Sequence, residues 1–293
     1  MQPKHVLWAV LVAALWGINF VVIRLGLDDF PPILLNALRF AVAGGLFAWF
    51  VKRPAIPVIN IIAVGLVLGV AKFTLLFIGM DAGMPAGLSS LVLQSQAFFT
   101  VLFAFTFLGE RPKRAQLVGM TVAFMGLGVI GLDLGQMGVV SAFAIILAAA
   151  GCWGVANILI KRSGAEDMLG LMVWASLAAA PPLLLLSFAF EGPERMAASL
   201  GALSVKGVGA VLYLAFAATL VGFGLWGRLL RLYPAGMVAP FSLLVPVFGL
   251  SSAALILGET LTPLKVAGAV LVILGLGINA GLMRKLRRQP TSS

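Results

Sequence analysis

Long apolar stretches separated by short polar segments fill almost the whole chain. They lie at 6–25, 32–51, 57–78, 85–108, 114–132, 138–160, 168–190, 206–227, 236–257 and 263–283. Most are long enough to cross a bilayer as a helix, which takes about 20 apolar residues. A stretch such as Val208–Trp226 has almost no polar positions at helical spacing, so it does not fit a soluble all-α protein. The pattern predicts an all-α integral membrane protein with about ten transmembrane helices.

Composition agrees with this pattern. Hydrophobic residues make up 61% of the 293 residues and charged residues 10%, whereas soluble domains carry roughly a quarter charged residues. Ten spans with short connections use nearly the whole length, which leaves no room for a soluble domain of ordinary size. The function must therefore reside in the membrane bundle.

Basic residues predict the orientation of the spans. If the N-terminus is cytoplasmic, the cytoplasmic segments contain Lys4, Lys52, Arg53, Arg111, Lys113, Arg114, Lys161, Arg162, Arg228, Arg231, Arg284, Lys285, Arg287 and Arg288. The opposite side receives only Arg24, Arg195, Lys206 and Lys265. Cytoplasmic loops are richer in Lys and Arg, so we expect both termini in the cytoplasm. The charge of +10 is spread over these short loops rather than clustered on one face, which argues against a nucleic-acid partner.

The second half of the chain repeats the first. At an offset of 149 residues, Pro85-Ala86-Gly87 matches Pro234-Ala235-Gly236, Leu108-Gly109-Glu110 matches Leu257-Gly258-Glu259, and Gly119 matches Gly268. Near the start of each half, Trp16-Gly17 and Trp153-Gly154 are each followed by a cation, Arg24 and Lys161. We therefore expect two five-helix units, residues 1–135 and 136–293. An odd number of helices gives the two copies opposite orientations, which is typical of secondary transporters, although channels also contain repeats.

These motifs resemble the EamA repeat of the drug/metabolite transporter superfamily. The shared features are Trp-Gly in the first helix of each unit, Pro-Ala-Gly entering the fourth and Leu-Gly-Glu leaving it, and the resemblance covers residues 6–283. Within the superfamily the chain looks most like the YddG-type amino-acid exporters. The resemblance implies a ten-helix basket with a central cavity between the halves, cytoplasmic termini, and export of metabolites across the inner (plasma) membrane.

Polar residues inside spans are costly and usually face a cavity or another helix. Trp16 and Asn19 are three residues apart in the first span, and Trp153 and Asn157 are four apart in the sixth, so each pair shares a helix face. We expect both pairs to bind substrate, because an indole offers a flat apolar wall and an amide can meet an ammonium or a carboxylate. The alternative is that Trp anchors an interface and Asn joins two helices.

Two cations lie deep within predicted spans. Arg39 is about seven residues into the second span, and Lys72 is at a comparable depth from the same side in the third. They can snorkel to the interface along their alkyl stems. Alternatively, one or both hold the carboxylate of a zwitterionic substrate, for which Arg offers a two-pronged fork.

Further candidates lie in the fourth, eighth and ninth spans. The fourth contains Gln94 and Gln96, which flank Ser95, and we expect at least one of the three to face the cavity. Tyr213 in the eighth span is a weaker candidate. In the ninth span, Pro240 and Pro246 flank Ser242; they should interrupt the backbone hydrogen bonds and form a hinge, with Ser242 lining the site.

Several kinds of chemistry are disfavoured. The chain contains no Walker A sequence, and His5 and Cys152 are its only histidine and cysteine, which argues against an enzyme, a metal site and a cofactor. No Asp or Glu lies deep within a predicted span, so proton coupling and facilitated diffusion both stay open.

The sequence therefore predicts a carrier that exports amino acids, aromatic or otherwise neutral, and similar small metabolites by alternating access. Positive candidate charges favour such substrates over cationic drugs. A drug or sugar-phosphate carrier is the alternative, followed by a channel or a membrane enzyme. The expected partners are a small-molecule substrate and membrane lipid, and a monomer is compatible with this interpretation.

Overall fold

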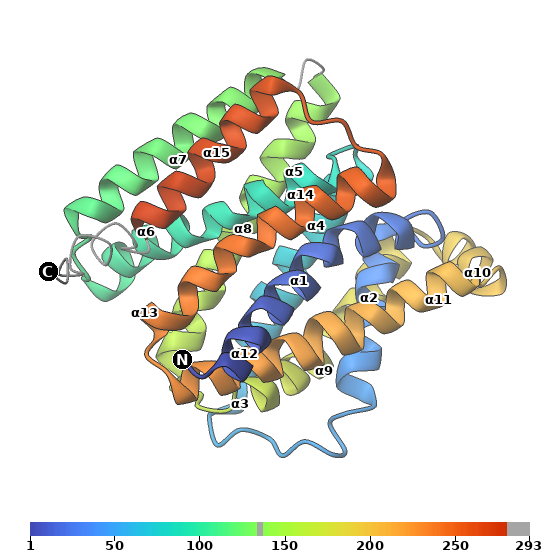
Figure 1. Cartoon of the computed structure of the whole chain (residues 1–293). Coiled ribbons are helices and arrows are strands. Elements are labelled where there is room, and N and C mark those ends of the chain that lie inside the picture. Colours follow the sequence, from blue (N-terminus) through green and yellow to red (C-terminus); the bar gives the residue numbers. More distant parts are fainter. Residues whose placement is uncertain (134–136, 280–293) are drawn as a thin grey trace, which may run out of the picture.

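The computed structural model describes residues 1–133 and 137–279, which form a bundle of packed helices (Figure 1). Over these residues all regular secondary structure is helical, without β-strands. Eight helical segments are long and apolar enough to cross a membrane, and two apolar helices, α2 (Pro32–Gly45) and α15 (Pro263–Asn279), are shorter. The predicted all-helical membrane fold is confirmed, and the count of ten spans stays a prediction.

The first half contains the elements up to residue 133. They are α1 (Pro3–Gly26), α2, α3 (Val58–Val64), η1 (Gly65–Lys72), α4 (Phe73–Asp81), α5 (Ala86–Val92), η2 (Leu93–Ser95), α6 (Gln96–Leu108) and α7 (Arg114–Asp133). The elements from α3 to α4 form one continuous span, as do those from α5 to α6.

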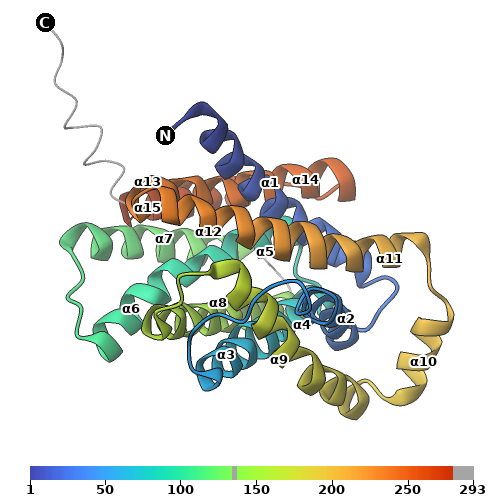
Figure 2. The same cartoon turned by 90° about the horizontal axis from the view of Figure 1, so that it is seen from below.

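The second half has the same order. Its elements are α8 (Met137–Ser163), α9 (Met168–Phe190), α10 (Pro193–Gly201), α11 (Val205–Leu212), η3 (Tyr213–Val221), α12 (Gly222–Leu232), α13 (Ala235–Val238), η4 (Ala239–Leu243), α14 (Leu244–Leu257) and α15. The short α10, which joins α9 to α11 at the edge of the bundle, has no counterpart among the predicted stretches (Figure 2). The predicted division between the halves, at residue 135, and the basic tail from Arg284 to Arg288 lie outside the described residues.

Large apolar side chains cover the outside of the bundle. Trp49, Leu132 and Leu255 are each more than four-fifths exposed, whereas Arg39 and Lys72 are buried. A soluble protein would rarely expose so much apolar surface. The distribution fits a molecule whose surroundings are lipid.

Helices α7 and α15 lie side by side along their whole length (Figure 1). A Cβ atom added at Gly119 would collide with the carbonyl oxygen of Gly275, and one at Gly126 would collide with that of Gly268. The contact partner therefore moves back along α15 as the residue number rises along α7, so the two helices are antiparallel. Glycine at these positions lets the two backbones touch.

A second pair of contacts relates the two halves. A Cβ at Gly17 in α1 would meet the side chain of Phe248 in α14, and one at Gly154 in α8 would meet that of Phe99 in α6. Phe99 and Phe248 are 149 residues apart, the offset of the sequence repeat. Matching helices therefore make matching contacts.

Departures from α-helical geometry also occur at matching places. The π-helical turns η1 and η3 fall at corresponding positions of the two halves, and so do the 3₁₀ turns η2 and η4. Pro240 lies in η4, as expected for a residue that removes a backbone donor. Pro246, however, lies within the regular helix α14, so the observed irregularity ends at Leu243. A hinge at these prolines stays a prediction.

One predicted boundary differs clearly from the structure. The second stretch was predicted to run from 32 to 51, but α2 ends at Gly45. Gly44 packs directly on the backbone of Leu177 in α9, and the chain then turns over residues 46–50. Pro54 and Pro57 follow, and proline cannot continue a helix.

Candidate functional site

A cavity of about 430 Å³ lies at the centre of the bundle, between the two halves. Its lining residues are Trp16, Asn19, Phe20, Arg39, Leu68, Lys72, Phe73, Leu76, Leu93, Gln94, Gln96, Ala97, Thr100, Trp153, Asn157, Ile160, Met168, Phe223, Trp226, Leu230, Ala239, Ser242 and Val245. The volume is within the range of small-ligand sites. Nine of the ten residues predicted to bind substrate line it.

Arg39 is 2% exposed and lines the cavity. Its Nε and Nη2 atoms donate to Thr219 Oγ1 at 3.2 and 3.0 Å. Thr219 in turn donates its proton to the carbonyl oxygen of Leu214, at 2.8 Å. The remaining terminal nitrogen, Nη1, has no hydrogen-bond partner within residues 1–133 and 137–279. The guanidinium is thus fixed on one side and retains unused donors on the other.

Lys72 is the second buried cation, at 1% exposure. Its Nζ lies 3.2 Å from the ring centroid of Phe73 and 4.2 Å from that of Trp153. The guanidinium carbon of Arg39 lies 3.9 Å from the same Phe73 ring. Among the residues that the structure describes, no carboxylate forms an ion pair with either cation or lines the cavity. Aromatic faces attract both cations but leave their charge uncompensated.

Aromatic rings form another part of the lining. Trp16 donates from Nε1 to the carbonyl oxygen of Ala218 at 2.9 Å, which fixes its indole. Its ring packs against Phe223 and Trp226, with centroids 5.2 and 5.3 Å away. Asn19, predicted to share this face, also lines the cavity, and its buried Oδ1 has no hydrogen-bond partner in the part of the chain that the structure describes. An acceptor is therefore available beside an apolar surface.

The predicted amides form two polar contacts. Asn157 Nδ2 donates to Gln96 Oε1 and to Thr100 Oγ1, both at 2.9 Å. Gln94 Nε2 donates to the backbone oxygen of Ser242 at 2.8 Å. Each contact joins the first half of the chain to the second, so the lining is assembled from both.

Three other polar residues are directed elsewhere. The Tyr213 hydroxyl, predicted to bind substrate, donates to the backbone oxygen of Leu15 at 2.9 Å, and Tyr213 is not among the lining residues. Ser95 donates to the backbone oxygen of Val92 in its own span. Trp174, in the first part of α9, donates from Nε1 to the backbone oxygen of Val51.

Sequence reasoning missed Thr219, Phe73 and Thr100. Thr219 is a single hydroxyl in an apolar span, and its partner Arg39 is 180 residues away in the chain. Phe73 directly follows Lys72, and Thr100 lies one helical turn after Gln96. Looking one turn to either side of each candidate would have found Thr100, but nothing in the sequence singles out Thr219.

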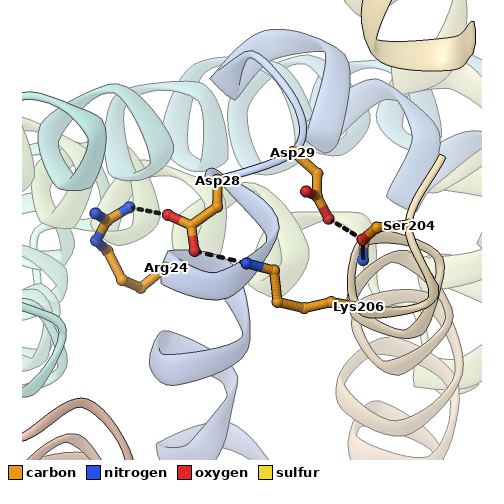
Figure 3. Close-up of polar contacts among 6 residues, drawn as sticks. Arg24, Asp28, Asp29, Ser204 and Lys206 are labelled. Atoms are coloured by element: carbon orange, nitrogen blue, oxygen red, sulfur yellow. Dashed lines mark hydrogen bonds and ion pairs between the residues drawn. The ribbon is translucent and has the colours of Figure 1, made fainter. Parts of the chain in front are cut away.

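The cavity reaches one end of the bundle and stops short of the other. Ile160 near the end of α8, Met168 at the start of α9 and Leu230 near the end of α12 line it. At the opposite end, Asp28 accepts from Arg24 at 3.1 Å and from Lys206 at 2.9 Å (Figure 3). Figure 3 also shows the Ser204 hydroxyl bound to the Asp29 carboxylate. These contacts tie the end of α1 to the start of α11 and close that end.

A solute-sized cavity with two buried cations inside an apolar helical bundle fits a membrane transporter. The EamA-like transporter family matches residues 3–132 and 140–280. The chain belongs to this family.

Curated relatives match over nearly their whole length. A probable amino-acid metabolite efflux pump of Salmonella typhimurium is 46% identical, with 95% of each chain covered, and one of Escherichia coli is 43% identical over the same share. A probable terminal-alkyne amino-acid exporter of Streptantibioticus cattleyicolor is 30% identical over 94% of this chain and 93% of the relative. A solved crystal structure covers 98% of this chain and 99% of its own with a TM-score of 0.65, and at 18% identity it supports the fold alone.

Proposed function

We propose that this protein is an inner-membrane carrier that exports amino acids and closely related metabolites. The observation that carries the proposal is the pair of buried cations, Arg39 and Lys72, which line a solute-sized cavity and have no carboxylate partner among the described residues. A buried charge is costly unless it is paired. A substrate carboxylate would supply the missing partner, with Nη1 of Arg39 as its donor.

The rest of the lining suits the other parts of an amino acid. The unpaired Asn19 Oδ1 can accept from an ammonium group. Trp16, Phe223 and Trp226 offer an apolar surface for a neutral or aromatic side chain. The names of the three relatives, two amino-acid metabolite efflux pumps and an amino-acid exporter, support the same substrate class.

Alternating access between two inverted five-helix repeats is part of the proposal. Three observations support it: the two halves share one sequence offset, α7 and α15 are antiparallel, and the Gly17 and Gly154 contacts match. An inverted duplication lets one packing arrangement close either end of the bundle. With both termini cytoplasmic, the end lined by Ile160 and Leu230 is the cytoplasmic mouth, open in this structure.

Uptake by purified protein in proteoliposomes tests the function. A panel should contain neutral and aromatic amino acids, their decarboxylated amines and a sugar phosphate. We expect saturable transport and counterflow of amino acids, and little transport of the amines. Repeating the assay with an imposed pH gradient separates proton coupling from facilitated diffusion. Transport of none of the amino acids would contradict the proposal.

A phosphate-bearing metabolite is the second candidate. The observation that favours it is the presence of two cations rather than one, since a phosphate can engage both Arg39 and Lys72. The sugar phosphate in the same panel decides between the two substrate classes.

A further inference from the structure

The two Leu-Gly-Glu motifs end their helices in the same way. Gly109 after α6 and Gly258 after α14 both have φ of 68°, the left-handed conformation common at helix ends. The backbone N–H of Glu110 then donates to Ala104 and that of Glu259 donates to Ala253, at 3.1 and 3.3 Å. Both carboxylates therefore start from the same local geometry.

Their carboxylates nevertheless bind different groups. Glu259 accepts from the backbone N–H groups of Ala86 and Gly87, at 2.6 and 3.0 Å, where α5 begins. Glu110 instead pairs with Lys161 Nζ at 2.5 Å, and both side chains are at least half exposed. One glutamate thus fastens two spans together, while the other makes a solvated ion pair.

The repeat provides the missing partner for each glutamate. Pro234-Ala235-Gly236 corresponds to Pro85-Ala86-Gly87, and the helical segment that continues to Leu257 begins at Ala235. Arg24 corresponds to Lys161, because each follows the Trp-Gly pair of its half at the same spacing. Arg24 is bound to Asp28 in this structure. Each glutamate therefore has one helix start and one cation as its two alternative partners.

The two arrangements occur at different ends of the bundle. Lys161 adjoins the lining residue Ile160, so the Glu110–Lys161 pair is at the end that the cavity reaches. Glu259 is at the closed end, where Glu191 likewise accepts from the N–H groups of Ile33 and Leu34. The glutamate bound to a helix start thus marks the closed end, and the ion-paired glutamate marks the open one.

We propose that Glu110 and Glu259 form a reciprocal latch, and this inference rests on the carrier function proposed above. When the open mouth closes, Glu110 leaves Lys161 and accepts from the backbone N–H groups of residues 235 and 236. At the other end, Glu259 releases α5 and pairs with Arg24, which leaves Asp28. Hydrogen bonds from amides to a carboxylate are stronger than an exposed ion pair, so each latched glutamate stabilises the closure of its own end.

The matched pair Glu110→Gln and Lys161→Gln tests the latch most sharply. Removing Glu110 removes the closing contact, so the mouth should open more often. Removing Lys161 frees Glu110 to bind the helix start, so the mouth should close more often. An ordinary surface salt bridge predicts the same effect from both substitutions, because each would break the same pair.

The measurement is a spin-label distance in the otherwise cysteine-free Cys152→Ala protein. Labels at Lys113→Cys and Leu232→Cys, two exposed positions near the segments that the latch joins, report open and closed molecules as long and short distances. Glu259→Gln weakens the closure of the opposite end. We therefore expect it to raise the closed-to-open ratio of the mouth about tenfold, which corresponds to the loss of one charged hydrogen bond. Lys161→Gln should raise the ratio and Glu110→Gln should lower it, while the exposed control Glu194→Gln should leave it unchanged.

Two outcomes would overturn the latch: shifts in the same direction for Glu110→Gln and Lys161→Gln, or unchanged ratios in both. Both positions are exposed, so these variants should fold even if Glu259→Gln does not. The distances are measured without substrate. Failure of the latch in a protein that still transports amino acids would leave the proposed function intact, whereas absence of transport by the unmodified protein would overturn the function separately.

Discussion

At the scale of single residues, Arg39 is the residue through which the proposed function links the fold to a substrate. Its guanidinium is buried and fixed on one side by Thr219, and its Nη1 has no partner among the residues described. We expect Arg39→Gln to weaken amino-acid transport by about 10- to 150-fold, because a charged hydrogen bond contributes about 1.5–3 kcal/mol. A decarboxylated amine should lose much less. Initial rates for both substrates, measured in the same liposomes, check this.

The variant Arg39→Lys serves as the control for a merely interfacial arginine. A residue that only snorkels needs a cation and a long stem, so Lys would replace it without loss. A residue that binds a carboxylate through two N–H groups needs the planar guanidinium, so the Arg39→Lys protein should then transport amino acids poorly. Equal losses for amino acid and amine would remove Arg39 from the site and leave Lys72 as the next candidate.

Thr219 should control substrate affinity through Arg39. Its hydroxyl oxygen accepts two N–H groups of the guanidinium, and its proton is bound to Leu214. Thr219→Val keeps the shape but leaves these buried donors unpaired, at a cost of about 1–3 kcal/mol. We expect a KM for amino acids raised roughly five-fold or more, with Thr219→Ser close to the unmodified protein. If Thr219→Ser were as impaired as Thr219→Val, the effect would come from packing rather than from the hydrogen bonds.

The sequence predicted those cavity-lining residues whose signal is local. Trp16 and Asn19 share a face by helical spacing, and Arg39 and Lys72 are conspicuous because charges are rare within spans. Thr219 could not be predicted, since its importance comes from a contact across 180 residues. Tyr213 was a candidate because it is an aromatic residue within a span. The packing of α1 against η3 instead directs its hydroxyl to the backbone oxygen of Leu15.

At the scale of helices, the contact between α7 and α15 depends on glycine. A methyl group at Gly126 would meet the backbone of Gly268 and Val272 as well as Leu271, whereas one at Gly128, two residues on, meets nothing within 4 Å. Alanine improves helix propensity by about 1 kcal/mol at either position. We therefore expect Gly126→Ala to lower the Tm in detergent by several degrees and Gly128→Ala to leave it unchanged or raise it, as measured by thermal unfolding. A Tm that is equal for both variants would contradict the close backbone contact.

The π-helical turns are a feature that apolar periodicity does not reveal. In η1, Gly65 packs on the backbone of Ala175 and Gly69 on the side chain of Ala179, both in α9. A π turn adds one residue and rotates everything after it by about 100° relative to an α-helix. The face presented by Lys72 and Phe73 is therefore set by contact with another helix. The ten apolar stretches could be found in the sequence, but the rotation of the helix after the π turn could not.

At the scale of the whole molecule, direction of transport depends on which end of the bundle faces the cytoplasm. The cavity reaches the end lined by Ile160 and Leu230, and basic residues such as Lys161 and Arg231 are close by in the chain. The charge bias predicts that this end faces the cytoplasm. An exporter that opens there can load its substrate from the cytoplasmic pool, so topology and function must agree.

Reporter fusions provide the test of this orientation. Reporters placed after residues 53, 113 or 162 should be active as cytoplasmic fusions, and those after residues 81 or 194 as external ones. The expected side follows from the charges near each fusion site. Basic residues resist translocation, and they precede the three cytoplasmic sites: Lys52, Arg53, Lys113 and Arg162. Asp81 and Glu194 lie in segments poor in basic residues. A single site that reports the opposite side would contradict the ten-helix topology. A uniform reversal of all five would keep the helix count but turn the open mouth outward, and the same structure would then load from outside.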